Sequence, residues 1–329
     1  MINIAIMGAG YIAGKMAQTL SGMKAKGNKT FGTYAVASRE ESRAQTFAKE
    51  HGFAKAYGSY EAMLNDPNVH LVYIATPHSH HYEQMKMCIA HGKHVLCEKA
   101  FTVNAPQAEE VIALAREKGL YMAEAVWTRY QPSRTFMLEI IDRGVIGTPK
   151  MVTANLAVPN WEKPRIHKME LAGGALLDLG IYAITFASMV LGSKVASIHT
   201  TAQMMDTGVD MQESITLIYE SGEMAVLCSA VTCAGDNRGV VYGTKGTLAI
   251  DNVTNPQVIT VTLHAAPEKE RTYPVPPQIT GYEYEVEAAI DAIGKGRLEP
   301  EAMPHAETIR IMRVMDELRA QWGLKYPFE

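Results

Sequence analysis

Short apolar runs alternate with segments of helical periodicity over the first 125 residues of the chain. The runs are rich in Ile, Val, Leu and Ala, as expected for strands that are buried on both faces. Five strands are predicted here, over residues 2–7, 33–38, 71–75, 93–97 and 120–124. Helices are predicted between them, over residues 11–25, 40–51, 82–91 and 104–118. This alternation is typical of parallel β-α-β units in a doubly wound α/β sheet.

After about residue 150 the predicted strands follow one another directly. They cover residues 150–158, 195–203, 214–219, 224–233, 240–242, 247–251 and 258–264. Turn signals such as Ser221-Gly222 and Thr244-Lys245-Gly246 join several of them, which indicates an antiparallel sheet. Helices are predicted near residues 175–191, 282–293 and 306–322. The chain is therefore expected to form an α/β domain over residues 1–125 and an α+β domain over residues 126–329, with the last helix able to pack back on the first domain.

Composition narrows the class of protein. The 329 residues suit two domains, and a net charge of −4 argues against a general nucleic-acid binder. No basic, apolar leader is expected at the N-terminus, and the apolar run over residues 181–191 falls far short of the ~20 residues that span a bilayer. We expect a cytoplasmic protein. Its cysteines are predicted to be reduced and buried: Cys88, Cys97, Cys228 and Cys233.

A glycine loop joins the first strand to the first helix. The loop reads G-x-G-x-x-A, and its predicted cofactor-binding residues are Gly8, Gly10, Tyr11, Ile12 and Ala13. Small residues allow a tight turn and close approach of a pyrophosphate to the helix N-terminus. The strand-turn-helix context is the one that a dinucleotide site requires. The alternative is an ordinary glycine turn.

The end of the second strand bears on the choice of cofactor. An acidic side chain here would bind the ribose 2′-hydroxyl of NAD, but this chain has Ser38 and Arg39, with Arg43 one helical turn later. A hydroxyl and guanidinium groups suit a phosphate monoester. NADP(H) is therefore favoured over NAD(H), although Glu40 and Glu41 follow closely. The alternative is that Arg39 is a solvated residue at a helix start.

Candidate ligand-binding residues also follow the third and fourth strands, because ligands bind at the carboxyl ends of parallel strands. They are Thr76, Pro77 and His81 after the third strand, and Glu98 and Lys99 after the fourth. A lysine near a nicotinamide can hold a substrate oxygen and lower the pKa of a neighbouring acid. The structural alternative is that Lys99 pairs with Glu98 or with solvent.

The histidines after the third strand do not predict a metal site. His78, His80 and His81 are expected on a turn, and no carboxylate or cysteine lies at a matching spacing. We expect His81 near the cofactor and His80 at a helix start. No metal is predicted.

The stretch over residues 173–182 is the informative part of the second half. Asp178 and Tyr182 are four residues apart on a predicted helix and therefore share one face. An Asp among apolar neighbours needs hydrogen bonds, and the paired glycines Gly173 and Gly174 would allow close approach to a ligand or to the other domain. A phenol has a pKa near ~10, which an ammonium such as Lys99 would lower. The alternative for Tyr182 is a half-buried core aromatic.

These segments resemble the glucose–fructose oxidoreductase, inositol dehydrogenase and rhizopine-catabolism family of NAD(P)-dependent oxidoreductases, and within it the dimeric dihydrodiol dehydrogenase group. The resemblance is carried by residues 8–13, 75–77, 95–99, 124–130, 173–182 and 303–308. It implies a Rossmann domain, a second domain with a large, open, mostly antiparallel sheet, and an active site in the cleft between them.

The resemblance also implies roles for individual residues. Lys99 would assist proton transfer, and Asp178 would orient the reacting groups. Tyr182 stands where most members have His, as in the dihydrodiol dehydrogenase group, and would carry the proton. The positions expected to line the cofactor or the cleft are Trp127, Arg129 and Arg165. The chain departs from the family pattern at Ala100, where Pro is usual, and at Ala172, where Gly is usual.

The expected activity is NADP(H)-dependent hydride transfer to or from a secondary alcohol or ketone of a cyclic diol or sugar-like substrate. The alternatives are an NAD-dependent sugar or inositol dehydrogenase, and a nucleotide-sensing protein without turnover. The expected partner is a small-molecule polyol, diol or sugar-like compound, with neither nucleic acid nor membrane. An open sheet leaves a face to cover, which suggests a homodimer or homotetramer through the C-terminal sheet.

Overall fold

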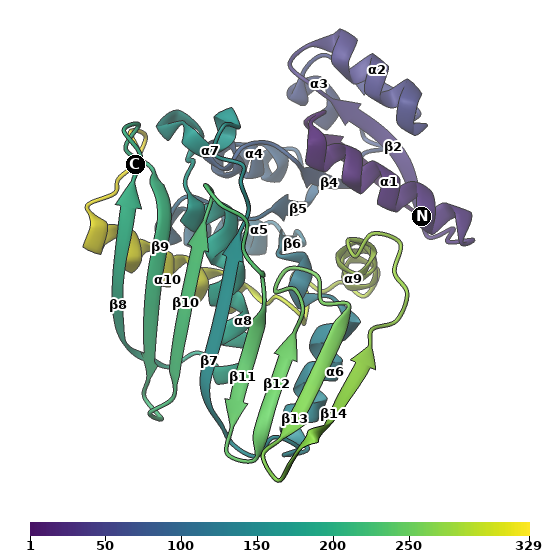
Figure 1. The fold of residues 1–329 in the computed structure, drawn as a ribbon. Coiled ribbons are helices and arrows are strands. Elements are labelled where there is room, and N and C mark those ends of the chain that lie inside the picture. The colour runs from purple at the N-terminus through teal and green to yellow at the C-terminus, as the bar shows by residue number, and fades with distance from the viewer. The chain divides into compact units, whose positions relative to one another are not determined.

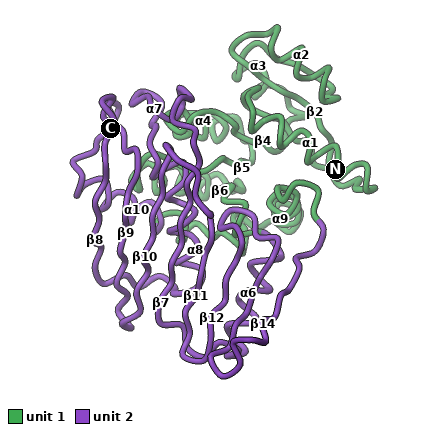
Figure 2. Tube along the Cα trace, in the orientation of Figure 1, with its two compact units in different colours: residues 1–130, 278–309 green, residues 131–277, 310–329 purple.

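The computed structural model describes residues 1–329, which divide into two compact units. Unit 1 contains residues 1–130 and 278–309, and unit 2 contains residues 131–277 and 310–329 (Figure 2). The domain boundary expected from sequence, at residue 125, lies close to residue 130, where the first stretch of unit 1 ends. The sequence did not indicate that residues 278–309 also belong to unit 1. Unit 1 is therefore built from two separated stretches of chain.

Unit 1 contains a six-stranded sheet in the order β3-β2-β1-β4-β5-β6 (Figure 1). All neighbouring strands run parallel. The strands are β1 (Ile2–Met7), β2 (Phe31–Ala37), β3 (Lys55–Tyr57), β4 (Leu71–Ile74), β5 (His94–Glu98) and β6 (Met122–Ala125). This is the strand order of a doubly wound dinucleotide-binding domain, which confirms the predicted Rossmann fold.

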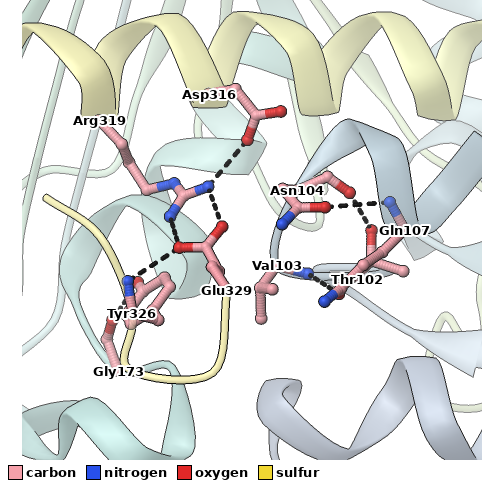
Figure 3. A network of polar contacts seen from close by, with 9 residues as sticks. All are labelled: Thr102, Val103, Asn104, Gln107, Gly173, Asp316, Arg319, Tyr326 and Glu329. Atoms are coloured by element: carbon pink, nitrogen blue, oxygen red, sulfur yellow. Dashed lines mark hydrogen bonds and ion pairs between the residues drawn. The ribbon is translucent and has the colours of Figure 1, made fainter.

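The helices of unit 1 connect these strands. They are α1 (Tyr11–Ala25), α2 (Glu41–His51), α3 (Tyr60–Leu64), α4 (His78–Ala90), α5 (Ala105–Glu117), the 3₁₀ turn η1 (Trp127–Arg129) and α9 (Glu283–Gly294). Asn104 caps α5 by accepting a hydrogen bond from the Gln107 backbone N–H at 3.0 Å (Figure 3). The short β3 and α3 were not predicted. The α9 residues Val286, Ala289 and Ala292 are buried in the same core as α1.

Unit 2 contains an eight-stranded sheet in the order β14-β13-β12-β11-β7-β10-β9-β8 (Figure 1). The β7–β10 pair is parallel and the other pairs are antiparallel, which confirms a mostly antiparallel sheet. The strands are β7 (Pro149–Ala157), β8 (Val195–Met204), β9 (Asp210–Tyr219), β10 (Met224–Ala230), β11 (Gly239–Gly243), β12 (Gly246–Ile250), β13 (Val258–Leu263) and β14 (Ala266–Pro274).

The faces of this sheet differ. Helix α8 (Ile181–Leu191) contacts β7, β10 and β11, and alternate residues of β10 are buried and exposed. On the exposed side, Met224 and Val226 have 38% and 42% of their surface accessible. The other helical elements of this half are α6 (Pro132–Asp142), α7 (Pro164–His167), the 3₁₀ turn η2 (Met169–Leu171), the π-helical turn η3 (Leu176–Gly180) and α10 (His305–Trp322), which continues from unit 1 into unit 2.

The stretch Met169–Leu191 contains η2, η3 and α8, and the predicted helix over residues 175–191 corresponds to η3 and α8. By length and composition the whole stretch could cross a membrane, with a mean hydropathy of 1.7, but 83% of its most apolar window is buried inside the chain. Such burial is that of a core helix.

The cysteine prediction is half wrong. Cys88 and Cys97 are buried, whereas Cys228 and Cys233 are exposed. Cys228 lies on the accessible side of β10, since side chains alternate between the faces of a strand. All four are free thiols, as expected.

Candidate active site

The glycine loop is shaped by the close approach of β4. Gly8 has a φ of +107°, and a Cβ at this position would lie 2.8 Å from the Ala75 carbonyl oxygen. Gly10 has open space around it, and Ala13 is fully buried against the core. Tyr11 is exposed and Ile12 is half-buried. Only a residue without a side chain therefore fits at Gly8.

A pocket of about 200 Å³ opens beside this loop. It is lined by Gly8, Ala9, Gly10, Ser38, Arg39, Glu40, Arg43, Tyr60, Ala75, Thr76 and Pro77. The Arg43 guanidinium donates a hydrogen bond to the Ala9 carbonyl at 3.5 Å, which holds it over the loop. Ser38 is buried, whereas Arg39 is exposed. The pocket thus joins several sequence-predicted residues from three separate loops of unit 1.

Tyr60 belongs to this pocket but was not predicted from sequence. The pKa of its phenol is raised by burial, and this is opposed by the charges of Arg39 and Arg43. Ser59 places Tyr60 by capping α3, because its hydroxyl accepts from the Ala62 N–H at 3.1 Å. The only sequence feature that could have indicated this helix, and with it Tyr60, is the capping residue Ser59.

These residues fit a dinucleotide. Gly8 and Gly10 line the pocket without side chains, so a pyrophosphate can approach the loop backbone, and the start of α1 favours an anion. Arg39 and Arg43 supply positive charge at the end of β2, where the ribose of the adenosine half is recognised.

His81 ties together the loops after β4 and β5. Its Nδ1 lies 2.8 Å from the Ala100 carbonyl and its Nε2 lies 2.9 Å from the Thr76 carbonyl. The ring is fully buried, and this burial lowers its pKa to about 4. A neutral imidazole carries one N–H and therefore donates to one of the two carbonyls.

The neighbouring histidines lie in the first turn of α4 and not on a separate turn before it, so the expectation of His80 at a helix start is confirmed. Helix α4 begins at His78, directly after Pro77, whose backbone is extended. His78 and His81 are buried and in ring contact at 5.8 Å, and His80 is half-buried. No group of three or more His, Cys, Asp or Glu side chains is arranged to hold a metal ion.

Lys99 is half-buried in the loop that follows β5. The Lys99–Ala100 peptide is cis. Phe101 follows this peptide, and its N–H donates to Oε1 of Glu124 at the end of β6, at 3.0 Å. Burial raises the pKa of Glu124 to about 7. His81 and Glu124 therefore both hold the peptide unit between Ala100 and Phe101, which follows Lys99 directly.

Three further predicted residues have contacts inside unit 1. Glu98 is buried and accepts a hydrogen bond from the Tyr73 hydroxyl. Trp127 stacks on Tyr282 with ring centroids 4.2 Å apart. Arg129 is buried, donates to the Ala302 carbonyl at 2.8 Å and pairs with Glu307 at 2.7 Å. These contacts explain how the three side chains are held, and their roles toward a cofactor stay predictions.

In unit 2, Asp178 is buried and doubly bound. Its Oδ1 pairs with the Arg165 guanidinium at 2.6 Å, and its Oδ2 accepts from the Asn160 amide at 3.1 Å. Tyr182 is 8% exposed and lies in the first turn of α8. The expectation that Asp178 needs hydrogen bonds is confirmed. Asn160 was missed, since nothing in its sequence surroundings marks it.

The paired glycines make close approaches within unit 2. A Cβ at Gly173 would lie 2.2 Å from the Ile166 carbonyl oxygen. A Cβ at Gly174, whose φ is +116°, would lie 2.0 Å from Oδ1 of Asp210. The approach that the sequence assigned to a ligand or to the other domain is therefore made to a backbone carbonyl and a carboxylate of the same unit.

The segment after α10 also holds Gly173. The buried Tyr326 hydroxyl donates to the Gly173 carbonyl at 2.7 Å (Figure 3). Arg319 binds both carboxylate oxygens of Glu329, at 2.7 and 3.0 Å, and Glu329 accepts from the Tyr326 N–H at 2.8 Å. This network fixes the chain just before the helix that carries Asp178 and Tyr182.

Comparison with known proteins shows which family this chain belongs to. Residues 2–125 match an oxidoreductase family with an NAD-binding Rossmann fold, and residues 136–249 match the GFO/IDH/MocA C-terminal domain. The chain is 33% identical to trans-1,2-dihydrobenzene-1,2-diol dehydrogenase of Xenopus tropicalis over 98% of each chain. It is 36% identical to the enzyme of the same name from Sus scrofa over 89% of each chain.

A solved 3-ketoreductase from Actinomadura kijaniata, in complex with NADP and TDP-benzene, has a similar structure. Its TM-score is 0.88 at 26% identity, with 97% of each chain covered. Fold and site together define an NAD(P)-dependent oxidoreductase. The chain belongs to the GFO/IDH/MocA family, as the sequence resemblance indicated.

Proposed function

We propose that this protein is an NADP(H)-dependent dehydrogenase or reductase that acts on a secondary alcohol or ketone of a cyclic diol or sugar-like substrate. The choice of NADP(H) is supported by the pocket beside the glycine loop, whose lining includes Ser38, Arg39 and Arg43. Guanidinium groups bind phosphate through paired, charged hydrogen bonds, and no acidic residue occupies the end of β2 itself.

The reacting residues would be Lys99, Asp178 and Tyr182. When bound, the nicotinamide supplies the hydride chemistry. Tyr182 would exchange the hydroxyl proton of the substrate, and Lys99 would hold the substrate oxygen. Asp178, fixed by Arg165 and Asn160, would orient the pair. Lys99 and Tyr182 belong to different units, so the proposal requires both to reach one substrate molecule.

The substrate class rests on the relatives. Those named above are called trans-1,2-dihydrobenzene-1,2-diol dehydrogenases, and the 3-ketoreductase was crystallised with TDP-benzene and NADP. That ketoreductase was also solved as a tyrosine-to-phenylalanine variant and as lysine variants. These are the residue types that the proposal places at the chemistry.

A second candidate is an NAD-dependent sugar or inositol dehydrogenase. The observation that favours it is the presence of Glu40 in the lining of the same pocket. A carboxylate there could accept from a ribose hydroxyl and would repel a 2′-phosphate.

We further propose that the protein is a cytoplasmic homodimer or homotetramer assembled through the accessible face of the unit 2 sheet. The exposed Met224 and Val226 side chains support this assembly, since exposed apolar side chains on a sheet mark a surface that another chain can cover.

The first experiment is a fluorescence titration of NADPH and NADH, side by side, with the intact protein. We expect NADPH to bind at least about tenfold more tightly, since hydrogen bonds to a charged group contribute about 1.5–3 kcal/mol. Arg39→Ala should weaken NADPH binding by about 10- to 100-fold and leave NADH binding nearly unchanged. Arg143→Ala, at an exposed arginine outside the pocket, is the matched control.

Each other outcome is informative. Tighter binding of NADH by tenfold or more would reject NADP(H) and support the second candidate. Binding of neither nucleotide would reject both candidates.

A further inference from the structure

The helical segment that carries Asp178 and Tyr182 begins without a cap of its own. The first backbone N–H groups of a helix have no partner inside the helix. Ala175, which precedes the π-helical turn η3, has no capping side chain. The Leu176 N–H instead donates to Oδ2 of Asp210 at 2.6 Å. Asp210 begins β9, so the cap comes from a strand distant in sequence.

Two glycines of the same segment leave room for two acids of β9. A Cβ at Gly174 would lie 2.0 Å from Oδ1 of Asp210, and a Cβ at Gly180 would lie 2.7 Å from Oε1 of Glu213. Asp210 is 0% exposed and Glu213 is 4% exposed. Any larger residue at Gly174 or Gly180 would therefore collide with one of these carboxyl groups.

The two acids differ in what surrounds them. Asp210 faces the N–H groups of Leu176 and Ala175, Arg319 from α10, Tyr326 from the following segment and Glu213 on its own strand. Glu213 faces Asp210 and receives a hydrogen bond from Ser229 on β10. Burial raises the pKa of Asp210 to about 6 and the pKa of Glu213 well above its usual range. Near neutral pH the negative charge of this pair is therefore expected on Asp210.

We propose that Asp210 is a positioning residue for the reaction: its carboxylate fixes the start of the helical segment, and so sets where Asp178 and the Tyr182 hydroxyl lie. The inference rests on the proposed function, in which Tyr182 exchanges the substrate proton. Asp210 acts through the Leu176 N–H and touches neither reacting group in the contacts described. A small displacement of a reacting group lowers turnover strongly, because productive geometry is narrow.

The test compares Asp210→Asn with Glu213→Gln in the intact protein. We expect Asp210→Asn to lower kcat by about 10- to 100-fold, with the KM for NADPH nearly unchanged. In the parent protein kcat should fall on the acid side with a midpoint near pH 6, as Asp210 gains a proton, and Asp210→Asn should lack this step. Glu213→Gln keeps the shape of the side chain and leaves the hydrogen bond from the Leu176 N–H to Asp210 in place, so kcat and the acid-side step should stay close to those of the parent.

Two results would overturn the inference. One is an Asp210→Asn protein with the parent kcat and the parent pH profile. The other is an equal loss in Glu213→Gln, which would indicate general packing. Tyr182→Phe is run alongside: if it keeps full turnover, the proton-carrying role of Tyr182 fails whatever Asp210 does, and if it is inactive while Asp210→Asn is not, only the positioning role of Asp210 fails.

A measurement on the parent protein needs neither a variant that folds nor a substrate. Amide hydrogen exchange over residues 173–182, corrected for the intrinsic pH dependence, should show protection that falls about tenfold or more between pH 7 and pH 5. Unchanged protection over this range would overturn the role of the carboxylate.

Discussion

The role of Tyr182 decides whether the segment around Asp178 takes part in catalysis or is only structural. Tyr182 is nearly buried at the start of α8, four residues after an Asp that is held by two partners. We expect Tyr182→Phe to lower kcat by about 10²–10⁴-fold, which is typical for loss of a general acid–base, with NADPH affinity little changed. Steady-state kinetics and nucleotide titration measure both quantities.

The matched control is Tyr34→Phe, which removes a hydroxyl that donates to Asp66 at 2.9 Å in unit 1. Its kcat should stay close to that of the parent. Near-normal turnover in Tyr182→Phe would remove the proton-carrying role.

At the residue scale, the sequence shows which buried side chains need hydrogen bonds, but not which residues provide them. A buried Asp178 needs hydrogen bonds, and the structure provides them. Asn160 and Asp210 could not be predicted, because each meets its partner through tertiary folding, and no periodicity connects positions so far apart. Tyr60 was missed for the same reason, since a five-residue helix leaves almost no pattern.

At the element scale, the long and strongly patterned segments were predicted well. Helix α1 has the bounds that the sequence gives, and the parallel strands lie where buried apolar runs occur. Strand β14 was missed because it is an edge strand whose charged and exposed residues do not alternate with apolar ones. The helix predicted over residues 175–191 contains the π-helical turn η3, which hydrophobic periodicity does not distinguish from an α-helix.

The segment before α8 gives a prediction at this scale. Gly174 and Gly192 both have positive φ, +116° and +82°, but only Gly174 has a neighbour that a Cβ would strike. Gly192→Ala should lower the free energy of unfolding by about 1–3 kcal/mol, as expected for backbone strain alone, with kcat unchanged. Gly174→Ala should lower the free energy of unfolding further and also reduce kcat, because Asp210 must move. Urea unfolding and kinetics on both variants measure the difference, and equal effects would contradict it.

At the scale of the whole molecule, the accessible face of the unit 2 sheet gives the prediction on assembly. Val226→Glu places a charge among exposed apolar side chains of β10. If copies associate through this face, the variant should shift toward monomer in light scattering after gel filtration, because burying an unpaired charge is costly. Ala196→Glu, at an exposed position of the edge strand β8, is the control. An unchanged mass for Val226→Glu, or a parent protein that is already monomeric, would reject this interface.

Unit 1 is completed late, because its second stretch, residues 278–309, follows nearly all of unit 2 in the chain. During synthesis on the ribosome, the parallel sheet emerges before α9, whose Val286, Ala289 and Ala292 complete the core around α1. Until then the apolar surface of α1 that α9 covers remains open to water and to other chains. A nascent chain that is released early therefore exposes an aggregation-prone dinucleotide-binding domain, so the order of synthesis, and not only the final contacts, determines when this cofactor site can form.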